Sequence, residues 1–200
     1  MSDEAATTKR KILEAAIRAL DEGGQSALRI IAVARDAGVS QGMIRYYFGD
    51  RESLVAEAMA TRFIERYGFM LDTFTELTAR CATQFEFRKV IENVLKQVYV
   101  ADRSHVRLER NSDIGMAKDH PQLAEQIARG RDGLCADLAA VFESARQRGL
   151  TRADVDPMNV AALYLSFAHG ISLWELGPES VTREALVATF QASLFALLFD

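Results

Sequence analysis

The chain has 200 residues, of which 49% are hydrophobic and 26% charged, with a formal net charge of −4 at pH 7. This composition provides for a real core and excludes a disordered or fibrous protein. No apolar run approaches the ~18 residues that a membrane span needs, and Met1 to Lys11 lacks the apolar run of a secretory signal. Cys81 and Cys135 are most simply free thiols, a disulfide or redox switch being the minor alternative. We therefore expect a cytoplasmic protein.

The charge is distributed unevenly along the chain. Residues 1–55 hold eight basic and eight acidic side chains, so the 16 basic and 20 acidic side chains behind them account for the whole net charge. DNA-phosphate binding depends on where basic groups point rather than on the total charge. Residues 1–55, which have no net charge and contain the cluster of Lys9, Arg10 and Lys11, are therefore compatible with DNA binding. For each of the three residues, a position at a solvated helix end is nearly as good an interpretation.

The first helix is predicted after a disordered start at residues 1–6. Thr7 or Thr8 would cap it, and Gly23-Gly24 would end it. Its apolar residues recur at helical spacing and form one stripe: Ile12, Leu13, Ala16, Ile17 and Leu20. Such a helix would pack behind the next two and complete a three-helix head.

Residues 30–49 predict two short helices joined by a tight turn. Gly38 stands where the first helix would end, at a position that favours a left-handed backbone, and Ser40 would cap the second helix. The second helix would bury Ile44 and Phe48 while polar side chains face outward. An ordinary helical hairpin is the alternative, but the complete small–glycine–apolar order favours a helix-turn-helix that binds DNA.

The motif residues also resemble a known family. The sequence Ala37-Gly38-Val39-Ser40-x-Gly42, followed by Tyr47-Phe48-x-x-Arg51-Glu52-x-Leu54, is similar to the DNA-binding half of the TetR family of bacterial regulators. Ile12-Leu13-x-Ala15-Ala16 and Glu22-Gly23 extend the resemblance upstream, to about residues 8–56. Arg45 replaces the tyrosine usual in the recognition helix, and Arg51 replaces a lysine. Both keep the capacity to bind phosphate, and Arg45 could also recognise guanine.

The DNA-contacting residues are predicted from the motif, its two flanks and the resemblance. Gln41 and Met43 would meet base edges, with Gly42 between them permitting close approach. Arg51, at the start of the next helix, would hold phosphate. The full predicted set is Lys9, Arg10, Arg29, Ser40, Gln41, Gly42, Met43, Arg45, Tyr46, Tyr47 and Arg51.

The rest of the chain is predicted to be helical, with no convincing strand. Asp156-Pro157 is a clear helix start, because proline fits the first turn, and Gly177-Pro178 would end that helix. The expected helices are Asp50 to about Leu77, Phe85–Val100, Arg103–Ala117, Gln122–Arg148, Pro157 to about Leu176 and Thr182–Phe199.

The last two of these helices have more apolar surface than one chain hides easily. We expect them to form a four-helix bundle between two subunits, with a thick intrachain core as the alternative. The proposed interface residues are Phe167, Trp174, Phe190 and Leu194.

The sequence offers no catalytic or metal-binding pattern. His105, His120 and His169 have no second His or Cys at metal-ligand spacing, and no Gly-x-Ser-x-Gly or phosphate-binding glycine loop occurs. We expect no enzyme activity and no cofactor. Aromatic and polar residues on the middle helices are compatible with a small-molecule pocket, although each aromatic alone is more often plain core. The predicted ligand contacts are Phe63, Tyr67, Met70, Tyr99, His105, Arg107 and Asn111.

Together these patterns predict an all-α protein of about nine helices. Residues 1–50 would form a DNA-binding head, and residues 51–200 a larger helical domain for ligand binding and dimerisation. The resemblance implies a transcriptional regulator, a repressor released from a palindromic operator by a small molecule. A helical ligand-binding protein or enzyme without DNA binding is the alternative.

Overall fold

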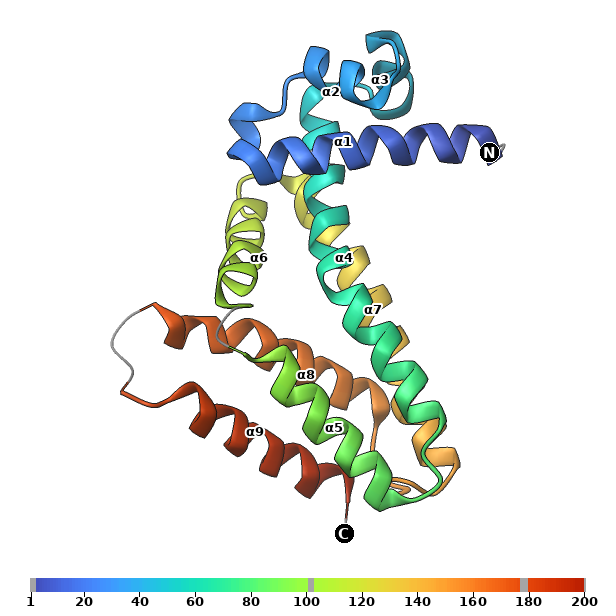
Figure 1. Cartoon of the computed structure of the whole chain (residues 1–200), viewed down its shortest axis with the longest axis vertical. Helices are drawn as coiled ribbons and strands as arrows, with labels where there is room; N and C mark the ends of the chain where they lie inside the picture. Colours follow the sequence, from blue (N-terminus) through green and yellow to red (C-terminus); the bar gives the residue numbers. More distant parts are fainter. Residues whose placement is uncertain (1–2, 101–102, 177–179, 200) are drawn as a thin grey trace. The chain divides into compact units, whose positions relative to one another are not determined.

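The computed structural model describes residues 3–100, 103–176 and 180–199 (Figure 1). Within these ranges the chain forms nine α-helices and no strand, which confirms the predicted all-α fold. The helices are α1 (Asp3–Ala27), α2 (Ile30–Ala37), α3 (Gln41–Phe48), α4 (Arg51–Ala79), α5 (Gln84–Val98), α6 (Ser104–Ala117), α7 (Pro121–Gln147), α8 (Pro157–Gly170) and α9 (Arg183–Leu198).

The chain divides into two compact units. Unit 1 comprises Met1–Glu65 and Asp113–Gly130, and unit 2 comprises Arg66–Ser112 and Arg131–Asp200. The boundaries therefore fall inside α4, α6 and α7. Unit 1 is larger than the expected head of residues 1–50 because it also includes the buried first half of α4. The division of function at residue 50 stays a prediction.

In unit 1, α1 packs against α2 and α2 against α3. The prediction that residues 1–6 are disordered and that Thr7 or Thr8 caps α1 is wrong for the described part, because α1 begins at Asp3. Thr8 lies inside the helix, where its hydroxyl donates to the Glu4 carbonyl at 3.0 Å. The expected interruption at Gly23-Gly24 is present, with a left-handed Gly24 (φ 65°) before the last residues of α1.

In unit 2, α5, α8 and α9 lie side by side (Figure 1), and α5 contacts α9. Aromatic rings fill the space between helices: the ring of Phe87 lies 6.4 Å from that of Phe142 and 6.3 Å from that of Phe199. A capping box that was not predicted from the sequence stabilises the N-terminus of α5. The side chains of Thr83 and Glu86 each accept a hydrogen bond from the other residue's backbone N–H.

The helix predicted from Pro157 to about Leu176 is shorter in the structure. It ends at Gly170 and continues as a 3-10 helix, η2 (Ile171–Glu175). The Ser172 hydroxyl donates to the His169 carbonyl at 2.5 Å, and such side-chain bonds compete with the regular helical ladder. The predicted stop at Gly177-Pro178 lies outside the described residues. Asp156 and Thr182 cap α8 and α9 as expected.

Within unit 1, α7 passes close to α4 at Gly130. A Cβ at this position would stand 2.6 Å from Cγ1 of Ile64 and closer still to its Cδ1, whereas a Cβ at Gly133 would meet nothing within 4 Å. The side chain of Ile64 is β-branched and has little rotamer freedom in a helix. Glycine at residue 130 thus permits the two helices to approach.

The two glycines of α7 form a matched pair for a stability measurement. Gly133→Ala should stabilise the protein by ~0.5–1 kcal/mol, the gain in helix propensity. Gly130→Ala should instead destabilise it by ~1–2 kcal/mol through overpacking, and adding Ile64→Ala should recover part of that loss. Urea unfolding of the four proteins measures this. Equal effects of the two alanines would contradict the close approach.

Candidate functional site

The turn between α2 and α3 has the geometry predicted from residues 30–49. Gly38 adopts a left-handed backbone (φ 67°), and the backbone N–H of Val39 donates to the Ala34 carbonyl at 2.9 Å. The Ser40 hydroxyl accepts from the backbone N–H of Met43 at 3.2 Å and caps α3. The start of α3 is therefore fixed by two local bonds and one glycine.

The helix α3 has one buried face and one exposed face. Ile44 and Phe48 are buried, as predicted. Gln41 and Arg45 are exposed one turn apart, and Tyr46 exposes 78% of its surface. The outward side of α3 thus combines an amide, a guanidinium and a phenol, all capable of hydrogen bonding to nucleic acid.

The other side chains of the predicted interface differ in how firmly they are held. Met43 exposes 36% of its surface and Tyr47 is half-buried, with the centroids of the Tyr46 and Tyr47 rings 5.1 Å apart in an edge-to-face arrangement. The glycine at residue 42 is exposed, and a Cβ there would be in ordinary contact with the Ser40 hydroxyl at 3.6 Å. Gly42 is therefore not required for packing within the chain, and its role in close approach to DNA stays a prediction.

The basic residues of unit 1 divide into paired and unpaired groups. Lys9 forms an ion pair with Glu57 at 2.6 Å and lies 5.4 Å from the centre of the Phe48 ring. Arg10 pairs with Glu14 at 3.0 Å. Arg29 and Arg45 are exposed, and their guanidinium groups form no hydrogen bond or ion pair with the described part of the chain. These two guanidinium groups, which flank and belong to the helix-turn-helix, are free to bind an incoming phosphate or base.

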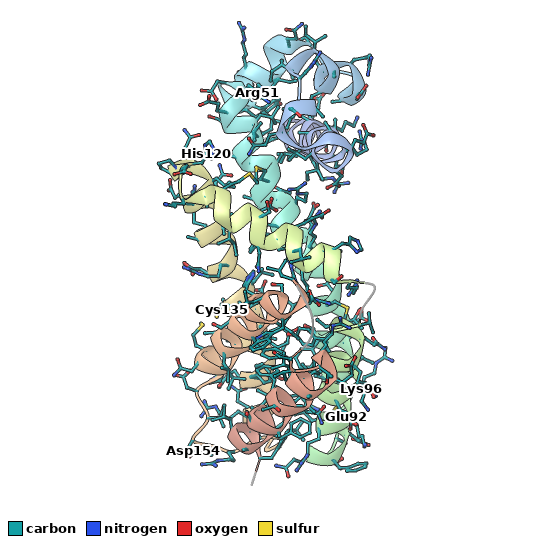
Figure 2. The ribbon with its side chains drawn as sticks, turned by 90° about the vertical axis from the view of Figure 1, so that its left-hand side faces the viewer. Arg51, Glu92, Lys96, His120, Cys135 and Asp154 are labelled. Carbon is teal, nitrogen blue, oxygen red and sulfur yellow. The ribbon has the colours of Figure 1, made fainter. Side chains whose placement is uncertain are left out.

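Arg51, at the first turn of α4, is held within unit 1 (Figure 2). Its Nε donates to the Leu28 carbonyl at 2.9 Å, and its Nη2 donates to the Gln25 carbonyl at 2.5 Å. The Gln25 carbonyl belongs to the last residues of α1, after Gly24, and the Leu28 carbonyl to the link between α1 and α2. A phosphate role for Arg51 stays a prediction, but the side chain has a structural role that the sequence did not indicate.

Asp50 caps α4 as expected from its position before the helix. It accepts from the backbone N–H of Ser53 at 2.7 Å, a bond that lowers the pKa of the Asp50 carboxyl. The carboxylate therefore stays ionised at neutral pH and complements the positive end of the helix dipole.

A buried ion-pair network in unit 1 was not predicted. Arg62 on α4 donates to Asp113 on α6 at 2.7 Å and to Asp21 on α1 at 3.2 Å. The side chain of Asp113 is almost fully buried, so loss of its arginine would leave a costly unpaired charge. No local motif marks this network, because its three residues are far apart in sequence.

Unit 2 contains an apolar cavity of about 60 Å³. The described residues that line it come from five helices: Met70, Leu71 and Phe74 of α4, Ile91, Val94 and Leu95 of α5, Leu134, Leu138 and Phe142 of α7, Tyr164 and Leu165 of α8, and Leu194 of α9. Of the predicted ligand contacts, only Met70 is among them. The other predicted contacts whose side chains the structure describes do not line this cavity, and their role in ligand binding stays a prediction.

The polar residues predicted to contact a ligand serve the structure of unit 2. Arg107 is 2% exposed and is paired through its guanidinium with Glu175, while Nη1 donates to the Val98 carbonyl at 3.1 Å. Asn111 donates to the His169 carbonyl at 3.2 Å. Through these bonds Arg107 and Asn111 join α6 to the α8–η2 segment, a structural role that the sequence did not indicate.

The other predicted contacts also lie elsewhere. Phe63 is buried in unit 1, and His105 is exposed. Tyr99 is buried, and its ring packs edge-on against that of Phe167 at 5.3 Å. Tyr67 belongs to α4, but its side chain lies outside the described part of the structure. Sequence periodicity places such residues on helices but does not identify which helix face borders a void.

The predicted dimer residues also divide into two groups. Phe190 and Leu194 are already buried within the single chain, which favours the alternative of a thick intrachain core for these two residues. The ring of Phe190 stacks on that of the half-buried Phe167, with centroids 3.9 Å apart. Trp174 remains 43% exposed. The aromatic side chains of α8 and α9 therefore pack partly against each other within one chain.

Both cysteines are free thiols, as predicted, and burial raises the pKa of each. Burial also lowers the pKa of His169 to about 4, so this side chain is neutral at pH 7. No described helix has the length and apolar character to cross a bilayer, and no cluster of three or more potential metal ligands occurs among these residues.

Comparison with known proteins connects this geometry to a family. The model of bacterial regulatory proteins of the tetR family matches residues 12–58, which include α2, α3 and the start of α4. The HTH-type transcriptional regulator BetI of Burkholderia cenocepacia is 28% identical over 160 residues, which cover 70% of this chain and 81% of that protein.

Solved structures share the fold over the whole chain. A TetR-family transcriptional regulator from Mesorhizobium loti is 18% identical, with a TM-score of 0.70 and complete coverage of both chains. The regulator FadR of Bacillus subtilis, solved in complex with stearoyl-CoA, is 19% identical with a TM-score of 0.53 and covers 93% of this chain and 97% of that one.

The two bonds of Arg51 predict a stability effect that is separate from any DNA contact. Arg51→Ala should destabilise the protein by ~1–2 kcal/mol, because two backbone carbonyls lose their donors. Arg45→Ala, which removes an exposed guanidinium with no described partner, should change stability by less than ~0.5 kcal/mol. Chemical denaturation of both variants measures the difference. A stability of Arg51→Ala equal to that of the native protein would show that the two bonds contribute nothing.

Proposed function

Because the chain belongs to the TetR family of bacterial regulatory proteins and is a DNA-binding transcriptional regulator, we propose that it represses transcription as a homodimer. A small-molecule ligand would release it from a palindromic operator. The observation that carries the proposal is the exposed polar face of α3, next to a turn fixed by Gly38 and Ser40.

Base recognition is assigned to the exposed side of α3. Gln41 stands in its first turn, and the N-terminal residues of a recognition helix meet base edges in the major groove. A glutamine amide pairs with adenine through two hydrogen bonds, and an arginine such as Arg45 pairs with guanine in the same way. The exposed and unpaired Arg29, just before α2, is suited to phosphate.

A second subunit would supply the second half-site. One recognition helix of eight residues reads few base pairs, and two-fold dimers place two helices about one DNA turn, ~34 Å, apart. The exposed side of α8 and α9 supports such a dimer: small residues recur at four-residue spacing between exposed leucines. The residues concerned are Ala162, Leu163, Ser166 and Gly170 on α8, and Ala185, Thr189, Ser193 and Leu197 on α9.

Ligand control would act through α4. This helix starts beside α3 in sequence and ends among the residues that line the cavity, so it belongs to both compact units. A ligand changes DNA affinity only if it binds two conformations with different affinity, and by linkage operator DNA must weaken ligand binding by the same factor. The similar FadR structure contains stearoyl-CoA, which is a property of that protein.

The DNA-binding proposal is tested with operator DNA selected from a random library. Gln41→Ala should lose ~1–3 kcal/mol of discrimination between operator and random DNA while keeping its affinity for random DNA. Arg29→Ala is the matched control: it should weaken binding to both DNAs and make the salt dependence shallower by about one unit. Equal losses on both DNAs for Gln41→Ala would exclude base reading by this residue. An absence of salt-dependent DNA binding in the native protein would overturn the proposed function.

The dimer is tested by placing charges on the exposed sides of α8 and α9. Leu163 and Leu197 expose 38% and 47% of their surface, so glutamate at both positions should leave the fold intact and produce monomers. Leu77→Glu, on the similarly exposed Leu77 of α4, is the control and should leave the dimer unchanged. Sedimentation velocity reports the mass, and circular dichroism the helix content. A Leu163→Glu, Leu197→Glu protein that remains dimeric would exclude this surface.

A further inference from the structure

The cavity of unit 2 has walls without charge. Eleven of its twelve described lining residues have apolar side chains, and Tyr164 is the exception. Phe74, Ile91, Leu95 and Leu194 among them are at most 6% exposed in the folded chain. Apolar cavities of this kind hold no ordered water, because water needs two to four polar partners. An apolar ligand entering here therefore displaces little or nothing.

Three charged side chains buried in the same unit pair with one another, and none of them lines the cavity. Glu175 accepts from Arg107 and, at 3.3 Å, from Arg183, and all three side chains are largely withdrawn from solvent. The buried ion pairs thus hold α6, η2 and the start of α9 together, and they provide no counter-charge for a ligand in the cavity.

The only polar group that the described wall offers is the Tyr164 phenol. Burial raises the pKa of this phenol, and the nearby positive charge of Arg110 and a hydrogen bond from Tyr99 oppose the rise only in part. Tyr164 therefore stays a neutral hydroxyl at pH 7. Arg110 itself is not among the described lining residues. A neutral phenol can orient one hydrogen-bonding group but cannot compensate a full charge.

We propose that the cavity bordered by α4, α5, α7, α8 and α9 binds a small uncharged molecule that is mainly hydrocarbon and has at most one hydrogen-bonding group, directed to Tyr164. This inference rests on the proposed ligand-responsive function and specifies the chemical class of the ligand. The volume of about 60 Å³ is well below the ~150 Å³ of an engineered cavity that holds benzene. A slender chain therefore suits it better than a ring. Met70, which is flexible and half-buried, can move to admit a longer one.

The experiment compares three probes that share a five-carbon chain: 1-pentanol, pentanoate and pentylammonium. Calorimetric titration of the full-length native protein should show binding of 1-pentanol. The two ions should bind at least ~100-fold more weakly, because each would have to leave its charge unpaired and desolvated. Pentanoate also tests the influence of Arg110 directly, since an anion would be the probe that this charge favours.

Two conservative variants place the binding in the cavity. Val94→Leu removes space and should weaken 1-pentanol binding about fourfold, the factor expected for one methylene group. Val94→Ala adds space and should strengthen it. Val181→Leu and Val181→Ala, at an exposed valine far from the lining residues in sequence, are the matched controls and should leave the affinity unchanged. Opposite effects of the two Val94 variants cannot arise from partial unfolding, which would weaken binding in both.

Two results would overturn the inference. One is pentanoate or pentylammonium binding as tightly as 1-pentanol with the same dependence on residue 94. The other is that no probe responds to the Val94 variants. The proposed repressor function can fail separately. If 1-pentanol binds in the cavity but leaves the affinity for operator DNA unchanged, ligand control by this class of compound is contradicted. The proposal that the cavity binds uncharged, mainly hydrocarbon molecules would still be supported.

Discussion

The burial of Ile44 and Phe48 is the interaction on which the DNA-binding unit depends. These side chains fix the rotation of α3 about its own axis, and that rotation decides which residues face outward. A turn of about 100° would expose an apolar side chain and bury Gln41 or Arg45, at the cost of leaving polar groups unpaired. Gly38 and Ser40 then fix where the helix starts, so position and rotation are both set by local chemistry.

The charged residues of the two units have different uses. In unit 1, Arg29 and Arg45 are left exposed, whereas Arg51 and Arg62 hold neighbouring segments together. In unit 2, the buried Arg107 is fully engaged by Glu175 and by backbone carbonyls. Removing one partner of such a pair is costly because the other charge stays buried. Arginine thus has two kinds of surroundings in this chain: exposed at the residues that we propose bind DNA, and hydrogen-bonded within the chain at the residues that stabilise the fold.

The apolar character of the cavity follows from the same separation. Five helices contribute its wall, and their inward faces are the apolar stripes that the core requires. A cavity between such faces is lined by apolar side chains. The packing of the core therefore sets the chemical class of the molecule that we propose binds there. The polar residues first assigned to the pocket, His105, Arg107 and Asn111, lie on α6, which contributes no described residue to the cavity wall.

The sequence by itself determined the helices, the turn at Gly38 and the outward face of α3, because these depend on residues within one or two turns of each other. It could not determine the ties of Arg51 to Leu28 and of Arg62 to Asp113, since each joins residues far apart in the chain. It also predicted Phe190 and Leu194 to be at an interface, because an excess of apolar residues has the same pattern whether it faces its own core or a partner. Only the tertiary structure, which brings Phe167 onto Phe190 and five helices around one void, decided between these two forms of burial.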